Sequence, residues 1–317
     1  MSDLSGVVVV NKPSGPTSFD VVRRVKSLFK TRRCGHTGTL DPTATGVLPI
    51  CIGDATKVAS YIADGEKEYE ATVRFGETTD TQDAAGKVLE TRPLGDLTEQ
   101  RFLDALQGFV GLIEQTPPMY SARKVDGKRL YELARAGEEV EREARTIHVE
   151  EARMTFFRPP DAGIFVRCSK GTYLRTIAHD LGARLGPGAH LRELKRVRVA
   201  SFTIDEAVGL DTLMAAAKAG DVQQYLLPLS RALDALAELR LDPALSRRVA
   251  HGHAPGPSDL TRLRAPPYSR GRKVRLTDPS GAVLAVAESD GVGTLKLLRV
   301  LVSGSGDLPQ GRAPDDE

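Results

Sequence analysis

Hydrophobic residues recur at two different periods in the first part of the chain. Residues 6–10 form a short apolar run followed by a cluster of turn formers, which predicts a buried strand and a tight loop. In residues 18–29, valine, leucine and phenylalanine recur at helical spacing, and Ser18 stands where a cap is expected. The arginines and lysines of this stretch are therefore expected on the solvent-facing side of a helix.

The segment after this helix has no regular period. Residues 34–49 are dense in glycine, threonine and proline, and the apolar triplet Ile50-Cys51-Ile52 comes directly after them. Because such residues favour turns, we expect a long loop followed by a short strand.

Strand and helix patterns then alternate up to residue 220. Residues 69–75 alternate between apolar and polar side chains, which predicts a half-buried strand. Thr98 begins one predicted helix, and Thr172 begins another that carries Tyr173 and Arg175 in its first turn. The same reasoning predicts strands at 147–156, 164–168 and 196–204, and helices at 128–136 and 211–220, the last capped by Asp211.

The predicted elements become shorter after residue 227. They are a helix around 243–250 and strands at 274–276, 283–287 and 295–302, the first two separated by Asp278-Pro279-Ser280-Gly281 as in a hairpin. We therefore expect a first domain over 1–227, a small β-rich second domain over 228–302 and, in the acidic Gly/Pro-rich residues 303–317, a disordered tail. By period alone the fold class is α+β.

Composition narrows the class of protein. The 317 residues include 40% hydrophobic side chains, enough for a large core and a second small domain. The first apolar run is too short to span a bilayer and no charged leader precedes it, so we expect a cytoplasmic protein. Three cysteines without zinc-ligand spacing favour reduced thiols, and we expect neither a disulfide nor a metal site.

Positive charge is concentrated in two stretches, although the net charge of the chain is only +2. Residues 23–33 contain six arginines and lysines, and residues 262–275 contain several more with no acidic residue among Arg264, Arg270, Arg272 and Lys273. Such stretches can neutralise phosphates, but a solvated helix face and a solvated loop explain them about equally well.

Asp41 is the residue with the largest number of possible chemical roles. It stands between Leu40 and Pro42 in a glycine-bounded loop where backbone groups can approach a ligand. A carboxylate there can act as a nucleophile, a general base or a metal ligand, or simply cap its own turn. For a lone Asp-Pro pair the last use is the commonest, so the surrounding residues must decide.

Around Asp41 the chain reads Gly35-His36-x-Gly38-x-Leu40-Asp41-Pro42-x-Ala44-x-Gly46-x-Leu48-Pro49. Further motifs, in chain order, are Asn11-Lys12-Pro13-x-Gly15-x-Thr17-Ser18, Lys67-Glu68-Tyr69, Pro118-Met119-Tyr120-Ser121-Ala122, Ser169-Lys170-Gly171-Thr172-Tyr173-Leu174-Arg175-Thr176 and Leu191-Arg192-Glu193-Leu194. In these residues and in their order, the chain resembles the TruB branch of the pseudouridine synthases from residue 6 to 210, and more weakly beyond.

The resemblance implies a fold and a reaction. The fold is a mainly antiparallel curved sheet flanked by helices, with a small PUA-like RNA-binding domain after it. Residues 124–145 correspond to a mobile insertion that closes over the RNA loop. The implied reaction converts uridine 55 in the TΨC loop of tRNA to pseudouridine after base flipping, and it needs no cofactor because no atom is added or lost.

The resemblance also assigns the catalytic residues. Asp41 is the catalytic carboxylate, Arg175 is its cationic partner and Tyr69 stacks on the flipped base. We expect the guanidinium to keep the pKa of Asp41 low inside a nearly dry pocket. Without the motif, Arg175 reads as a surface arginine and Tyr69 as half-buried packing.

Four further residues are implied to bind substrate. His36 occupies the space vacated in the RNA loop, and Tyr173, Leu194 and Lys12 line or support the pocket. Without the family context, His36 is a loop histidine bonded to backbone, and for Leu194 packing and pocket roles are hard to separate. His251 and His253, which lack a third ligand, are expected to face solvent.

The implied partner is tRNA, without an obligatory protein partner, a membrane or a second copy of the chain. Two alternatives stay open. One is a guide-RNA-dependent isomerase of ribosomal RNA, although relatives of that kind are shortened at 124–145. The other is a tRNA-folding chaperone whose catalysis is incidental, because reaching the base requires opening and refolding the loop.

Overall fold

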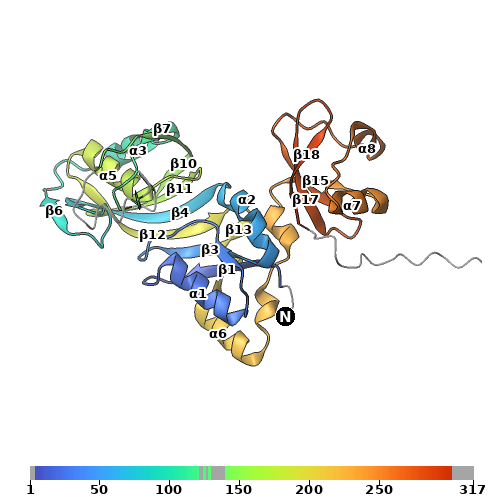
Figure 1. Cartoon of the computed structure of the whole chain (residues 1–317). Helices are drawn as coiled ribbons and strands as arrows, with labels where there is room; N and C mark the ends of the chain where they lie inside the picture. The colour runs from blue at the N-terminus through green and yellow to red at the C-terminus, as the bar shows by residue number, and fades with distance from the viewer. Residues whose placement is uncertain (1–3, 121–123, 126–127, 130–139, 302–317) are drawn as a thin grey trace, which may run out of the picture.

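The structure is a computed structural model that describes residues 4–120, 124–125, 128–129 and 140–301. The described chain forms one large sheet and one four-stranded sheet, which lie at opposite ends of the view in Figure 1. Most of the expected insertion over 124–145 and of the expected helix over 128–136, and the whole expected tail 303–317, lie outside the described residues. No helix in the described ranges is both long enough and apolar enough to cross a bilayer.

The large sheet has the order β14-β1-β3-β12-β4-β11-β10-β7, with β2 added to β3 and β13 added to β12. Its strands are β1 (Gly6–Lys12), β2 (Cys34–His36), β3 (Thr45–Ile52), β4 (Lys67–Phe75), β7 (Gly111–Gln115), β10 (Arg145–Arg158), β11 (Asp161–Cys168), β12 (Ala189–Val199), β13 (Phe202–Thr203) and β14 (Val208–Gly209). Only the pairs β1–β14 and β3–β12 are parallel, so the sheet is mainly antiparallel, as predicted.

Helices cover the two faces of this sheet at different places. Valines and isoleucines of β1 and β3 pack against α1 (Ser18–Leu28) and α6 (Leu210–Ala219). Farther along the sheet, residues of β4 and β11 pack against α3 (Glu99–Gln107) and α5 (Leu174–Leu185). The smaller elements are the 3₁₀ turns η1 (Gly53–Val58), η2 (Ile204–Glu206), η3 (Val222–Tyr225) and η4 (Leu229–Leu233), helix α2 (Ala59–Ala63), and the hairpins β5 (Glu77–Thr79) with β6 (Val88–Thr91) and β8 (Lys124–Val125) with β9 (Lys128–Arg129).

Two predicted caps at the start of the chain's helices are wrong because tertiary contacts use the side chains. Thr17, not Ser18, caps α1; the Ser18 hydroxyl instead bonds the backbone of Leu40, accepting from its N–H and donating to its carbonyl. The Thr172 hydroxyl donates to the carbonyl of Ser169, and α5 starts after Tyr173 with no side-chain cap. Arg175 nevertheless lies in the first turn of α5, as predicted.

A third predicted cap and two predicted strand limits are also wrong. Asp211 lies inside the first turn of α6, whose N-cap is Gly209. The segment 34–49 is not all loop, because β2 and most of β3 lie within it, and β12 starts at Ala189 rather than Arg196. Neighbouring strands on both sides of β3 supply the ladder hydrogen bonds, and this pairing overrides the weak strand propensity of its glycine and proline.

The small sheet has the order β15-β16-β17-β18. Its elements are β15 (Ala237–Arg240), β16 (Lys273–Thr277), β17 (Val283–Ser289) and β18 (Leu295–Val300), with α7 (Pro243–Ala250) and α8 (Pro257–Arg262). The predicted hairpin is confirmed as β16–β17, whereas β15 and α8 were not predicted. Val283, Val286 and Leu301 share one hydrophobic cluster with Val7 and Val9 of β1, so the two sheets are joined by a common core.

Candidate active site

The loop that carries Asp41 runs between β2 and β3 and is held at several points. The N–H of Leu40 donates to the Ser18 hydroxyl, and the N–H of Ala44 donates to the carbonyl of Asp41 itself. Gly46 closes the loop with φ +101, where a Cβ atom would lie 2.2 Å from the carbonyl oxygen of Arg196. The loop therefore has a fixed shape, and this position requires glycine.

Lys12 supports the same loop from the protein interior. Its side chain is fully buried, and Nζ donates to the carbonyls of Pro13, Pro42 and Ala44 at 3.0, 2.9 and 2.7 Å. Burial lowers the pKa of Lys12 to about 8, although the nearby carboxylate of Asp41 opposes this shift. Lys12 does not line the pocket described below, so its contacts are those of a supporting residue.

Arg175 and Asp41, 134 residues apart, form a two-point ion pair. Nε lies 2.9 Å from Asp41 Oδ2, and Nη2 lies 3.3 Å from Oδ1. The remaining donors reach the carbonyls of Thr81 and Tyr120 at 3.1 and 2.8 Å. The Arg175 side chain is only 4% exposed, so α5 delivers a nearly buried guanidinium whose orientation is fixed by three partners.

Asp83 is a second carboxylate at this guanidinium, and the sequence did not single it out. Its Oδ2 lies 3.8 Å from Arg175 Nε, while Oδ1 accepts from the Thr81 hydroxyl and the N–H of Ala85. The polar run from Thr78 to Asp83 just after a strand is the signal that could have drawn attention to it. One cation therefore serves two carboxylates.

The pKa of Asp41 is raised above its ordinary value, contrary to the sequence-based expectation. Burial is the main cause, Arg175 opposes it, and the negative charge of Asp83 adds to the rise. The Asp41 side chain keeps 37% of its surface exposed to the pocket. Arg175 does lower the pKa of Asp41, as expected. This effect is smaller than the rise in pKa caused by removing the carboxylate from water.

Tyr69 of β4 and the Asp41 loop face a common pocket of about 380 Å³. Its lining includes Asp41, Tyr69, Tyr173, Arg175 and Leu194, five of the seven residues singled out from the sequence. Tyr69 is 7% exposed, and its pKa is raised by burial, an effect that Arg196 opposes. The pocket thus combines the carboxylate of Asp41, the guanidinium of Arg175 and aromatic surface.

Tyr173 and Leu194 reach the pocket from two different elements. Tyr173 precedes α5 and is held by Gln115, which accepts from its N–H at 2.8 Å and donates to its carbonyl at 3.1 Å. Leu194 lies on β12, half-buried, and also packs beside the hydrophobic cluster of β4 and α5. Both of the uses considered for Leu194, packing and pocket lining, therefore apply.

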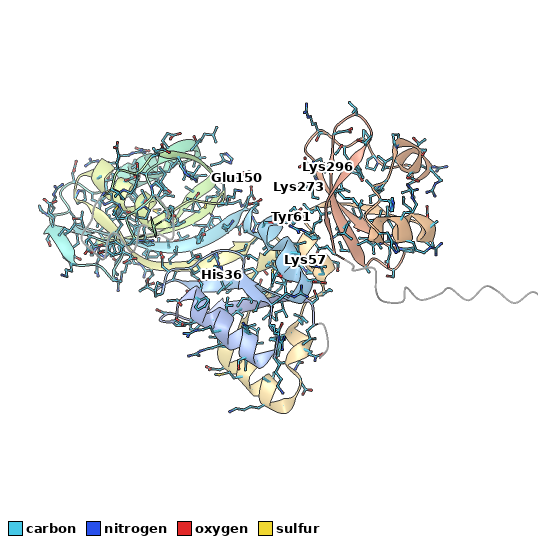
Figure 2. The ribbon with its side chains drawn as sticks, viewed as in Figure 1. His36, Lys57, Tyr61, Glu150, Lys273 and Lys296 are labelled. Atoms are coloured by element: carbon cyan, nitrogen blue, oxygen red, sulfur yellow. The ribbon has the colours of Figure 1, made fainter. Side chains whose placement is uncertain are left out.

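His36, labelled in Figure 2, lies on β2. It is not among the residues that line this pocket. Its Nδ1 accepts from the N–H of Gly38 at 3.3 Å. Burial and the nearby charge of Arg196 lower its pKa, which favours the neutral ring at neutral pH. These contacts suit a positional rather than an acid–base residue.

Lys67 and Arg196 also line the pocket, and the sequence did not single out either as a site residue. Lys67 Nζ donates to the carbonyls of Ala63 and Gly65 at 2.5 and 2.6 Å, and burial lowers its pKa to about 8. Both are basic residues at inward-facing positions of β4 and β12. Their place beside the pocket becomes apparent only once these two strands are paired.

Two family models match the chain. The family described as "TruB family pseudouridylate synthase (N terminal domain)" matches residues 26–174, and the "tRNA pseudouridylate synthase B C-terminal domain" matches residues 175–234. A relative from Saccharophagus degradans is 43% identical over 304 residues, which cover 94% of this chain and 96% of that protein. The chain belongs to the TruB family.

Other members and solved structures agree with this assignment to the TruB family. A relative from Thermobifida fusca is 45% identical over 293 residues, covering 90% of this chain and 94% of its own; like the first, it is named tRNA pseudouridine synthase B. The solved structure "Crystal Structure of a Cbf5-Nop10-Gar1 Complex" has a TM-score of 0.74 at 23% identity, covering 94% of this chain and 85% of that one. At this identity the likeness shows the fold alone, which is the predicted pseudouridine synthase fold.

Proposed function

We propose that this chain converts uridine to pseudouridine in tRNA, at position 55 of the TΨC loop, with Asp41 as the catalytic carboxylate. The TruB relatives that match nine tenths of the chain carry the name of a tRNA pseudouridine synthase. The observation that carries the proposal is the Asp41–Arg175 ion pair, which presents a carboxylate to a pocket walled by Tyr69.

The reaction balances without a co-reactant. The bond from N1 of uracil to C1′ of ribose breaks, the detached base turns, C5 bonds to C1′, and the C5 proton is lost while N1 gains one. Positive charge develops at C1′ as the first bond breaks. Asp41 can stabilise that charge, add to C1′ or remove a ribose proton, and each role needs its ionised form.

Arg175 favours that ionised form and fixes its direction. Two contacts from one planar guanidinium hold both carboxylate oxygens, which leaves little freedom for the carboxyl group to rotate. Because burial and Asp83 both raise the pKa of Asp41, the guanidinium is needed to limit that rise. Arg175 is therefore proposed as catalytic through the charge and orientation of Asp41.

The pocket volume suits one nucleoside rather than a stretch of RNA. A uridine inside a folded loop is stacked, so the enzyme must extrude it before the pocket can receive it. We assign the ring of Tyr69 to stacking on the flipped base, and Tyr173 and Leu194 to the walls around it. Lys12 supports the Asp41 loop, and His36 is assigned to the space that the extruded nucleotide leaves.

We assign RNA binding also to residues 228–302, as a PUA-like domain attached to a catalytic domain over 1–227. In Figure 2, Lys273 and Lys296 lie on the side of the small sheet that faces the large one, near Tyr61 of α2. Lys273 Nζ is 5.0 Å from the centre of the Tyr61 ring. In the basic stretch 262–275, however, Arg262 and Arg275 already bond carboxylates, which leaves the residues between them for phosphates.

We further propose that the protein acts alone, as a monomer in the cytoplasm. The guide-dependent alternative is not favoured, because the relatives at 43–45% identity carry the tRNA synthase name. The chaperone alternative predicts that Asp41→Asn leaves the biological contribution of the protein intact. Mapping pseudouridine in unmodified tRNA treated with this protein alone tests the proposal: a single modified site at position 55 is expected, and unmodified tRNA would overturn it.

A further inference from the structure

Arg196 is the largest of the fully buried side chains in the described part of the protein, with 1% of its surface exposed. It lies on β12, between the strands that form the two halves of the pocket. In the parallel pair β12–β3 it stands opposite Gly46, and in the antiparallel pair β12–β4 it stands opposite Tyr69. Its position in the sheet is therefore between the Asp41 loop and the tyrosine.

The guanidinium of Arg196 is directed at the loop backbone. Nε donates to the carbonyl of Val47 at 2.8 Å, Nη2 to Gly38 at 3.0 Å and Nη1 to Thr39 at 3.4 Å. These carbonyls flank Asp41 on both sides in sequence. One side chain thus ties the beginning of the catalytic loop to β3, the strand that follows it.

Arg196 has no carboxylate within ion-pair distance among the residues that the structure describes, which is unusual for a buried cation. Tyr69 stands directly opposite Arg196 on β4, and the charge of Arg196 acts on its phenol group. A buried guanidinium must use its donors to offset the loss of hydration, and here they reach three carbonyls on either side of Asp41 in sequence. The arrangement makes the tyrosine and the loop depend on each other.

We propose that Arg196 is a positioning residue for the isomerase reaction, which couples the Tyr69 ring to the Asp41 loop before RNA binds. This proposal deepens the proposed function and rests on it. If the ring stacks on the base and Asp41 acts at the ribose, then the distance between them sets the geometry of bond cleavage. Arg196 fixes this distance through contacts to both sides, without touching the substrate sugar.

The test compares Arg196→Lys with Arg198→Lys on intact protein. Lysine keeps the charge but offers one point of contact instead of a planar fork, so the loop loses simultaneous contacts. Arg198 lies on the same strand and bonds Glu68 and the carbonyl of Ala200, away from the loop, so it is the matched control.

We expect Arg196→Lys to lower kcat by about 10²-fold, the effect of a misplaced catalytic group, with KM and the Kd for tRNA unchanged. Arg198→Lys should keep wild-type kcat. A kcat in Arg196→Lys equal to that of the control, or a loss matched by weaker tRNA binding, would overturn the proposal.

Amide hydrogen exchange gives a readout that does not depend on activity. In Arg196→Lys the amides of Leu40 and Ala44, bonded to Ser18 and Asp41, should exchange faster while amides of α3 are unchanged. Uniform acceleration everywhere would indicate general destabilisation and would contradict the proposal. If Arg196→Lys does not fold, Tyr69→Phe replaces it: it removes only the hydroxyl, and the same two amides should exchange faster, whereas unchanged exchange would reject the coupling.

The two failures are distinguishable. Wild-type protein that leaves tRNA unmodified would remove the proposed function, whereas the exchange experiment would still report whether Arg196 links Tyr69 to the loop.

Discussion

Around the pocket, the buried cations Lys12, Lys67 and Arg196 donate to backbone carbonyls, whereas in the small-sheet region Arg262 and Arg275 bond carboxylates. A carbonyl does not neutralise a cation, so these buried charges keep a cost that only their geometry offsets. In the small-sheet region, the charges of Arg262 and Arg275 are offset by these carboxylates. The buried cations around the pocket therefore hold the backbone in place. The arginines of the small-sheet region lie nearer the surface and form ion pairs.

Arg175 belongs to both classes, since it bonds one carboxylate firmly and two carbonyls. This mixture is what a catalytic pair requires: the carbonyls hold the guanidinium still, and the guanidinium then holds Asp41. The contrast between the regions predicts large effects of substitution at the pocket and small, additive effects at the small sheet.

The largest expected effect is that of Asp41→Asn. The amide keeps the size of the side chain but removes the charge, so turnover should fall by roughly 10⁴-fold or more, as for loss of a catalytic group. Binding of tRNA should change little, because phosphates and loop contacts supply most of the affinity. Release of tritium from tRNA labelled at C5 of uridine measures the first, and filter binding the second; retained turnover would remove Asp41 from the chemistry.

Arg175→Lys sharpens the comparison by leaving the charge and removing the two-point contact. We expect kcat to fall by about 10²-fold, comparable to the loss of one preorganised electrostatic contact. Arg175 lowers the pKa of Asp41 against the effect of burial, so a weaker contact lets that pKa rise further. Asp41 then stays protonated to a higher pH, and the acid limb of the pH profile of kcat/KM should move upward.

Arg184→Lys on the same helix is the control for that measurement, because Arg184 lies over the ring of Phe109 and bonds the carbonyl of Ala105. Its acid limb should match the wild type. An Arg175→Lys limb that stays in place, or moves to lower pH, would contradict the role given to the guanidinium.

Lys12→Met tests whether a buried cation holds the loop. Three carbonyls lose a charged donor, so the free energy of unfolding should fall by about 1–3 kcal/mol at neutral pH. Denaturant unfolding measures this fall. Lys57→Met, which removes a surface ion pair with Asp54, should change it by at most about 0.5 kcal/mol. Equal effects in the two variants would count against the contrast drawn above.

Lys12 also gives a sign for the pH dependence of stability. Its pKa is about 8 in the folded state, below the unfolded value of about 10.4, so between these values the unfolded chain holds the proton and the folded chain does not. The free energy of unfolding should therefore rise with pH in that window. Lys12→Met should reduce the rise, while Lys67, with a similar shift, keeps part of it.

The smallest effects are expected at the small sheet. Lys273→Ala and Lys296→Ala should each weaken tRNA binding modestly and reduce the slope of log Kd against log salt by about 1, the signature of one lost phosphate contact. Wild-type affinity itself should fall steeply with salt. Lys218→Ala at the end of α6 serves as the control and should leave the slope unchanged. A slope unaffected by both substitutions would remove this surface from the RNA interface.

The motif around Asp41 and the other motifs, taken together as a resemblance to a known family, were sufficient to predict the family and five residues that line the pocket. Asp83 and Arg196 could not be found in this way. Each depends on partners from other strands or helices, and the polar run that ends at Asp83 marks the segment but not its contact with Arg175. The spacing of hydrophobic residues predicted the order of strands and helices well, because an element that buries one face carries that spacing in its own sequence.

Boundaries and caps were less predictable. The Ser18 hydroxyl bonds Leu40 and the Thr172 hydroxyl bonds Ser169. Both residues are of a type that can cap a helix, as predicted, but here their hydroxyls make other hydrogen bonds. β3 extends through residues that disfavour strands because it has partners on both sides. The rise in the pKa of Asp41 was missed because the depth of its burial depends on elements far away in the chain.

Asp41 meets Arg175 across 134 residues, and β3 meets β12 across a similar interval. At roughly 5–20 residues per second, the ribosome makes the Asp41 segment between about 7 and 27 s before the helix that holds it. During that time no guanidinium stands beside the carboxylate and no strand closes the far side of β3. The catalytic centre therefore cannot be complete until synthesis has passed β12, when the small sheet is still to be made.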